Sequence, residues 1–241
     1  MLLILKTGST LPPLRHQGDF EDWIKAGVRP TPVTTKDVTR GTTLPDPSAL
    51  AGVIVTGSPA MVSHREPWSE DAAAWLSRAA NGGLPILGIC YGHQLLAHAL
   101  GGSAGPNPRG REIGTVTVKT RPEAAHDPLL GALPGSFPAH VTHEESVLEL
   151  PAGAIRLAEN AHDAHQAFRW GKHAWGVQFH PEFDATITRS YIFHRRHDLR
   201  REGLHPRGIY RQVQETPYAT SLLERFTTYC MNLEHPRVPP R

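Results

Sequence analysis

The stretch over residues 84–102 constrains most strongly what this chain can fold into. A short apolar run over residues 86–89 follows the breaker group Asn81-Gly82-Gly83, a pattern typical of a buried strand in a parallel sheet. Leucines and alanines then recur at helical spacing over residues 95–100, and two glycines end the predicted helix at 101 and 102. The stretch therefore predicts a strand, a sharp turn and a helix.

The turn between this strand and helix reads Gly88-Ile89-Cys90-Tyr91-Gly92, which is the cysteine form of the nucleophile elbow G-x-S-x-G. Glycines on both sides let two backbones pass closely, and the turn sets the thiol at a helix N-terminus. The helix dipole there favours the thiolate, which makes Cys90 a candidate nucleophile. The alternative is a small buried cysteine with no chemistry, which is the usual state of a free cysteine.

Composition excludes several function classes. The 241 residues are 39% hydrophobic and 20% charged, with a net charge of +2, which favours a globular protein and gives no sign of nucleic acid or a membrane surface as partner. The apolar start is too short for a signal peptide, and no apolar run reaches the length of a membrane span. Cys90 and Cys230 form no CxxC motif, so we expect a reduced, cytoplasmic protein without disulfides.

The order of predicted elements favours an α/β fold. Strands are expected over residues 2–5, 50–56 and 86–89, with helical patterns within 8–29, over 68–80 and after Cys90. This βαβαβα order predicts a parallel sheet covered by helices, with chemistry at the carboxyl ends of the strands. Short strand-like runs over 113–118, 137–143, 155–158, 167–170 and 174–179 indicate that the second half adds antiparallel members. From 186 the chain looks helical, and the proline-rich residues 236–241 are expected to be frayed.

A cysteine nucleophile needs a histidine to take its proton and usually an acid to orient that histidine. Of 15 histidines, His180 is the best placed, because it follows a strand-like run and can reach the sheet edge where Cys90 is expected. In His180-Pro181-Glu182 the histidine and the acid are two residues apart, so their side chains point to the same side of an extended segment. Glu182 can then hold the imidazole while His180 faces the thiol.

Residues 85–94 and 176–182 together resemble the two signatures of the class I, triad-type glutamine amidotransferases, with a likeness to the glutaminase domain of GMP synthase and its stand-alone relatives. The resemblance covers about 53–182. It implies a three-layer flavodoxin-like sandwich with a central, mainly parallel sheet, a small antiparallel sheet and a helical C-terminal tail. We expect a single domain over 1–241, with a core of about 1–190 and a tail of about 186–235.

The resemblance also assigns roles to residues. It implies a catalytic triad of Cys90, His180 and Glu182, and an oxyanion hole formed by the backbone N–H groups of Tyr91 and Ser58, the second within the turn Thr56-Gly57-Ser58-Pro59.

For substrate binding the resemblance implies Gly57, Gln94, and a loop containing Thr142 and His143 whose backbone and imidazole contact the α-amino and carboxylate end. Plainer interpretations remain open for two of these. Gln94 is then an exposed helix residue and His143 an ordinary loop histidine.

The implied reaction is hydrolysis of the glutamine side-chain amide through a Cys90 γ-glutamyl thioester, giving glutamate and ammonia, with no metal or organic cofactor. A separate synthetase subunit is a possible partner. One alternative is a stand-alone γ-glutamyl peptidase or hydrolase, and another is a non-catalytic binding or regulatory module.

Other polar groups are expected to be structural. His93 and His98 lie on the elbow helix, and His162-Asp163-Ala164-His165 fits a solvated turn better than a metal site. Arginines at 195, 196, 200 and 201 predict a solvated helix face, or else a docking surface for an acidic partner.

Overall fold

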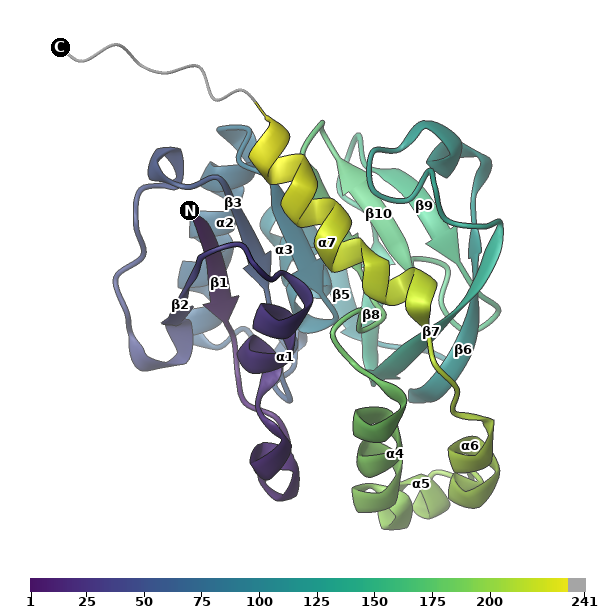
Figure 1. Cartoon of the computed structure of the whole chain (residues 1–241). Coiled ribbons are helices and arrows are strands. Elements are labelled where there is room, and N and C mark those ends of the chain that lie inside the picture. Colours follow the sequence, from purple (N-terminus) through teal and green to yellow (C-terminus); the bar gives the residue numbers. More distant parts are fainter. Residues whose placement is uncertain (234–241) are drawn as a thin grey trace, which may run out of the picture.

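The computed structural model of the chain describes residues 1–233 and shows a large twisted sheet between two layers of helices (Figure 1). The strands are β1 (Leu2–Lys6), β2 (Val33–Asp37), β3 (Gly52–Val55), β4 (Ile86–Ile89), β5 (Ser103–Pro106), β6 (Glu112–Thr120), β7 (Ser136–His143), β8 (Glu145–Glu149), β9 (Ile155–Glu159), β10 (Ala167–Trp170) and β11 (Ala174–Val177). The α-helices are α1 (Phe20–Gly27), α2 (Pro67–Asn81), α3 (Tyr91–Ala99), α4 (Ala185–His194), α5 (Arg196–Arg201), α6 (Pro206–Gln212) and α7 (Pro217–Asn232).

Nine strands form the main sheet in the order β2-β1-β3-β4-β11-β10-β9-β6-β7, and β5 pairs with β8 in a small second sheet. The first five strands of this order are parallel to one another, and the pairs from β11 to β7 are antiparallel. The α/β fold with a small antiparallel sheet is confirmed. Because β4 and β11 are parallel neighbours, the segments that follow them, carrying Cys90 and His180, leave the sheet at the same edge.

The inner parallel strands β1, β3, β4 and β11 are buried on both faces, and their alternating side chains divide the core in two. Leu2 and Ile4 of β1 pack in the cluster that contains the apolar face of α7, whereas Leu3 and Leu5 pack in the cluster with α2 and α3. Strands covered on both faces read as continuous apolar runs, which is why β1, β3 and β4 could be predicted from the sequence.

The C-terminal helix is part of this sandwich. Leu222, Leu223 and Phe226 of α7 are fully buried in the first core cluster, and Trp175 of β11 packs edge-on against Tyr229. Figure 1 shows α7 lying across one face of the sheet beside α1, while α4, α5 and α6 form a group at the carboxyl edge. The expected helical tail is thus two different structures, a covering layer and an edge group.

The short strands β2 and β5 are not predicted by the sequence pattern. The β2 segment, Val-Thr-Thr-Lys-Asp, is half-buried at the edge of the sheet and has no apolar run. The β5 segment, Ser-Ala-Gly-Pro, contains a glycine and a proline, which are rare in strands and typical of turns.

None of the helices within residues 1–233 is long and apolar enough to cross a membrane. The segment 236–241, expected to be frayed, lies outside the described residues.

Candidate functional site

The expected elbow is present between β4 and α3. Cys90 stands at the N-cap of α3 with φ 51° and ψ −101°, a backbone conformation that side-chain-bearing residues rarely adopt. A Cβ on Gly88 would lie 2.4 Å from the backbone oxygen of Gly92, and one on Gly92 would lie 2.5 Å from that of Val55. The two glycines are therefore required by close backbone approach, and the strained cysteine is held by the strand and helix on either side.

We predict that Gly88→Ala destabilises the fold by about 3 kcal/mol or more, because the new methyl group meets backbone that cannot move aside. For a chain of this size, that corresponds to a melting temperature lower by roughly 6–12 °C. Thermal unfolding followed by circular dichroism measures the shift. Gly135→Ala is the matched control, since a Cβ there meets no atom within 4 Å. Equal melting temperatures for the two variants would contradict the steric argument.

His180 follows β11 and is fixed from several directions. Its backbone N–H donates to the carbonyl of His140 at 2.8 Å, and its ring Nδ1 lies 2.8 Å from Oε1 of Glu182. Phe183 stacks on the ring with 4.1 Å between centroids, and Phe20 stacks at 6.2 Å. The ring Nε2 is buried and has no hydrogen-bond partner among residues 1–233, which leaves it as the atom available to the thiol.

The electrostatics at His180 favour the imidazolium. Burial alone would lower its pKa, but the negative charge of Glu182 and the neighbouring Cys90 sulfur outweigh it, and the pKa of His180 is raised to about 10. Glu182 is itself buried, with its side chain fully covered. The arrangement can hold a proton on His180 next to Cys90, the state that a thiolate nucleophile needs.

Two small cavities meet at Cys90. One contains His180, Phe20 and Ser58 in its wall, and the other is lined by Ser58, Tyr91 and Gln94 among other residues. The Cys90 thiol lies 3.8 Å from the carbonyl oxygen of Thr142, which also lines both cavities. The structure thus brings Cys90, His180, Ser58, Tyr91, Gln94 and Thr142 to one place.

The turn after β3 approaches the histidine closely. A Cβ on Gly57 would lie 3.0 Å from Cε1 of His180, so glycine permits the contact with the ring. The hydroxyl of Ser58 turns away and donates to the carbonyl of Thr7 at 2.8 Å. Within residues 1–233, Arg65 and Cys90 are the non-glycine residues with positive φ, so Ser58 takes its position without a left-handed backbone.

Gln94 is buried, not an exposed helix residue. Its Nε2 donates to the carbonyl of Glu145 at 2.7 Å and to Oε1 of Gln178 at 3.0 Å. Carbonyl oxygens only accept hydrogen bonds, which fixes the orientation of the amide. Gln94 therefore joins α3 to β8 at the cavity wall, and its amide nitrogen is already used within the protein.

The expected loop around Thr142 and His143 is instead the junction of two strands. Thr142 and His143 end β7, and β8 begins at Glu145, so one residue lies between them. His143 is 4% exposed, with Nδ1 2.9 Å from the carbonyl of Glu145 and Nε2 3.0 Å from the carboxylate of Glu112. Glu112 lies directly opposite His143 on β6. Both ring nitrogens are thus engaged inside the protein, which leaves the His143 imidazole no free atom for the substrate contact expected from the sequence.

Of the charged groups that line the second cavity, Glu144 and Glu145 belong to the loop over 142–147 that resembles the family's substrate loop, whereas Arg111 and Arg195 belong to no sequence motif. Arg195 is expected on a solvated helix face, yet its side chain is only 21% exposed and lines both cavities. No local pattern marks the two arginines, because they come from the segment just before β6 and the junction of α4 and α5.

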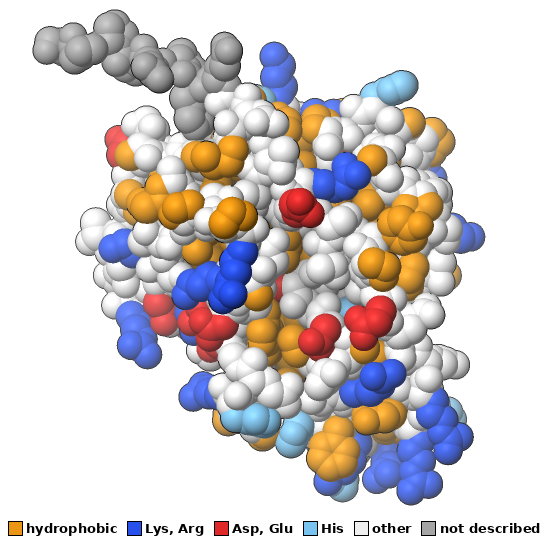
Figure 2. All heavy atoms as spheres, viewed as in Figure 1, with side chains coloured by type: hydrophobic (Ala, Val, Ile, Leu, Met, Phe, Trp, Pro, Cys, Tyr) orange, Lys and Arg blue, Asp and Glu red, His pale blue; other side chains and the backbone are white. Residues whose placement is uncertain are grey.

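The other arginines at the outer surface of α4, α5 and α6 lie away from Cys90. Arg196, Arg200, Arg207 and Arg211 line a separate groove of about 470 Å³ between α4, α5 and α6. Figure 2 shows basic side chains gathered over this lower edge of the molecule. The arginine-rich segment therefore splits, with Arg195 at the Cys90 cavity and its neighbours on the surface.

The other histidines of the elbow helix have structural contacts. His93 is fully buried against Phe168, and burial lowers its pKa to about 3. His98 lies 3.1 Å from Glu70 near the surface. Both arrangements agree with the structural role expected for them.

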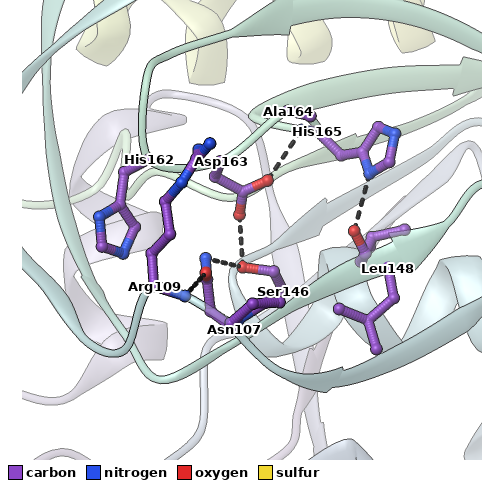
Figure 3. A pocket seen from close by; sticks show the side chains of 10 residues that line it. Asn107, Arg109, Ser146, Leu148, His162, Asp163, Ala164 and His165 are labelled. Carbon is purple, nitrogen blue, oxygen red and sulfur yellow. Dashed lines mark hydrogen bonds between the residues drawn. The ribbon is translucent and has the colours of Figure 1, made fainter.

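A further cavity of about 270 Å³ lies beside β8 and the turn that carries His162 and His165 (Figure 3). Asn107 donates to the hydroxyl of Ser146 at 2.7 Å, and Ser146 donates to Asp163 at 2.6 Å. The rings of His162 and His165 each face a backbone carbonyl. The polar side chains of this cavity are thus hydrogen-bonded within the protein. Residues 1–233 contain no cluster of three or more His, Cys, Asp or Glu side chains suited to a metal ion.

The two thiols differ sharply in environment, and we predict that iodoacetamide modifies Cys90 at least about 10²-fold faster than Cys230 at neutral pH. Cys230 is 1% exposed within α7, and burial raises its pKa to about 12. Cys90 instead lines cavities beside a cationic histidine. Mass spectrometry of the two cysteine peptides over time measures both rates in one sample. Equal rates would count against an activated thiol at Cys90.

Comparison with known proteins agrees with this geometry. The family model for class I glutamine amidotransferases matches residues 19–198. GMP synthase of Thermomicrobium roseum is 38% identical over 147 residues, 59% of this chain and 26% of that protein. The glutamine-hydrolysing GMP synthase subunit of Ignicoccus hospitalis is 40% identical over 110 residues, 45% of this chain and 56% of that subunit. The match thus spans about a quarter of the first relative and about half of the second.

Solved structures share the fold over nearly the whole chain. A glutamine amidotransferase of Thermotoga maritima superposes with a TM-score of 0.77 at 21% identity, covering 97% of this chain and 99% of that one. Another, of Methylobacillus flagellatus, gives 0.74 at 22% identity, covering 95% and 92%. The family match covers most of the described residues, including the elbow and His180-Pro181-Glu182. The chain therefore belongs to the class I glutamine amidotransferase family.

Proposed function

We propose that this protein hydrolyses the side-chain amide of glutamine through a γ-glutamyl thioester on Cys90. The observation that carries the proposal is the placement of Cys90, whose backbone is strained at the N-terminus of α3, in one cavity with His180. The Nδ1 atom of that histidine is held by the buried carboxylate of Glu182. Nucleophile, base and orienting acid in this arrangement are the elements of covalent acyl transfer.

In the first step the Cys90 thiolate attacks the amide carbon, and the backbone N–H groups of Ser58 and Tyr91 stabilise the oxyanion. The carbon–nitrogen bond then breaks, and His180 gives its proton to the leaving ammonia. In the second step His180 takes a proton from water, which attacks the thioester. Glutamate leaves and the Cys90 thiolate is restored. Glu182 keeps the imidazole in position and offsets its positive charge throughout.

The ammonia released at Cys90 needs an acceptor, and one relative suggests where it goes. The Ignicoccus hospitalis relative is a subunit of GMP synthase, so a glutaminase of this family can be a chain separate from its synthetase. We propose that this chain likewise passes ammonia to a synthetase partner. A free Cys90 thiol is required, which a reducing compartment such as the cytoplasm would maintain.

The test is hydrolysis by the purified protein across glutamine and a panel of γ-glutamyl peptides and amines, with Cys90→Ala as the control. Cys90-dependent release of ammonia from glutamine supports the proposal. A strong preference for γ-glutamyl peptides would replace it with the peptidase alternative. Absence of turnover together with no acylation or alkylation of Cys90 would favour the non-catalytic module.

A further inference from the structure

The four residues from His180 to Phe183 form a tight turn that follows β11. The backbone N–H of Phe183 donates to the carbonyl of His180 at 3.4 Å, and Pro181 takes the second position of the turn, which suits its fixed φ. Asp184 then caps α4 by accepting from the backbone N–H of Ile187 at 2.7 Å. The turn thus brings the side chain of Phe183 back beside that of His180.

The Phe183 ring lies flat against the imidazole of His180. The two ring centroids are 4.1 Å apart and the ring planes differ by 19°. The two residues are only 2% and 1% exposed. The ring of Phe20, which also stacks on His180, is 6.2 Å away. Phe183 is therefore the aromatic ring in direct contact with the imidazole face, at a place from which water is excluded.

Two helices hold the Phe183 ring in this position. Tyr191 of α4 stacks on it with 5.1 Å between centroids, and Trp23 of α1 meets it edge-on at 5.4 Å. The hydroxyl of Tyr191 is itself hydrogen-bonded to that of Thr10 at 2.7 Å. Because these contacts and the turn restrict its rotation, the Phe183 ring can fix the plane of the imidazole that it covers.

The contact also bears on the charge of His180. The face of an aromatic ring is electron-rich and attracts a cation, and the attraction is larger where water is excluded. A neutral imidazole gains much less from the same contact. Glu182 reaches the edge of the His180 ring at Nδ1, whereas Phe183 covers its face, so the two contacts can act together. Both favour the protonated form of His180.

The remaining titratable and charged groups around His180 act on its charge in different directions. The Cys90 sulfur favours the positive charge. His140 on β7 is neutral at pH 7, because burial lowers its pKa to about 4, and burial raises the pKa of the Tyr191 hydroxyl, which is neutral as well. Arg195 in the cavity wall adds a positive charge that opposes protonation of His180. An aromatic ring can offset this opposing charge without a second carboxylate.

We propose that Phe183 is a positioning residue for His180, holding the imidazole in the plane that directs Nε2 toward Cys90 and stabilising its protonated form by a cation–π contact. The inference rests on the proposed role of His180 as the base and adds the residue that covers its face. Phe183 lines neither cavity at Cys90, so it acts through His180 and not on the substrate.

The test changes the electron density of the ring and leaves its shape nearly constant. Phenylalanine bearing one, two or three fluorine atoms is incorporated at position 183, since each fluorine withdraws electron density from the ring face. The protonation of His180 is followed by NMR of its ring nitrogens between pH 6 and pH 11, with His180→Gln identifying the signal. We expect the proton affinity of His180 to fall at each step, to about tenfold below that of the wild type with three fluorines.

Phe226 offers the matched control for this series. It is fully buried, packs edge-on against Trp175 and lines neither cavity at Cys90. Fluorinated residues at position 226 should leave the titration of His180 unchanged. An equal proton affinity across the series at position 183 would overturn the inference, and so would a His180 ring that is neutral at pH 7 in the wild type.

Phe183→Leu gives the kinetic counterpart. Leucine keeps an apolar side chain but removes the ring, so we expect kcat for glutamine to fall by about 10–10², because the base is no longer held in its plane. KM should stay within about twofold of the wild type, since the substrate contacts remain. Phe226→Leu also removes a buried ring and should retain the wild-type kcat. If both variants lose the same share of kcat, Phe183 is a packing residue only and the inference fails.

The NMR titration needs no substrate, so it separates this inference from the proposed function. A stepwise fall in the proton affinity of His180 without any hydrolysis of glutamine would refute the proposed function and support the role of Phe183. Hydrolysis that depends on Cys90, together with an unchanged titration, would support the proposed function and refute the role of Phe183.

Discussion

Replacing Cys90 with alanine is expected to lower glutamine hydrolysis by at least about 10⁴-fold, to the background of the assay. In the proposed mechanism the sulfur of Cys90 forms the thioester. Among residues 1–233 Cys230 is the other cysteine, located in α7 on a different part of the fold. Ammonia release measured with a coupled enzyme assay gives the loss, and intact-mass measurement after quenching should show no acyl adduct on the variant.

The control for this result is Cys230→Ala, which leaves the cavity at Cys90 untouched and should retain the wild-type rate. The Cys90 side chain is small and packs at the cavity edge, so Cys90→Ala should still unfold cooperatively near the wild-type temperature. A Cys90→Ala variant that keeps even a tenth of the activity would exclude covalent catalysis through this thiol.

The second large effect is expected for His180→Gln, with kcat/KM lower by about 10³–10⁴. In the proposed mechanism the imidazolium of His180 gives a proton to the leaving ammonia, which a glutamine side chain at this position cannot do. The substitution also removes the positive charge beside Cys90. The same variant should therefore alkylate more slowly with iodoacetamide at pH 7. Both rates are measured side by side, with His98→Gln as a matched control, because His98 pairs with Glu70 away from the cavity.

The pKa of His180 also predicts how this variant changes stability with pH. Because the folded-state pKa is raised to about 10 from an ordinary 6.5, the protonated ring contributes stability that is fully present below about pH 6.5. That contribution is lost as the pH rises through about 10. Urea unfolding between pH 6 and pH 10 should show the decline in the wild type and less of it in His180→Gln. Parallel curves would mean that His180 is not a cation in the folded protein.

The residues proposed for catalysis can be predicted from the sequence because each lies in a short local pattern. Cys90 stands between two glycines that close backbone approach requires, after an apolar strand. His180 and Glu182 are two residues apart, and the 2.8 Å contact between their side chains follows from that spacing. The topology then brings both segments to one edge because β4 and β11 are parallel neighbours.

The two arginines that line the cavity cannot be predicted from the sequence, because Arg111 and Arg195 are far apart in the chain and meet only in the folded protein. His143 was expected to face the substrate, but Glu112, located opposite it on β6, takes up its ring. Arg195 lies among other arginines, and a local charge run does not reveal which one turns inward. Which acid or base remains unpaired depends on the whole set of contacts around the cavity, and periodicity gives no access to that.

The position of α7 has a consequence for how the protein matures during synthesis. On one face of the sheet, Leu2, Ile4 and Ile54 are covered by α7, whose buried side chains include Leu222 and Phe226. These residues lie more than 150 positions later in the chain. Until α7 has left the ribosome, the nascent chain carries an uncovered apolar surface. We expect this interval to be the time when the chain depends most on chaperones, and nonsense truncations that remove α7 to yield aggregates instead of a weakened enzyme.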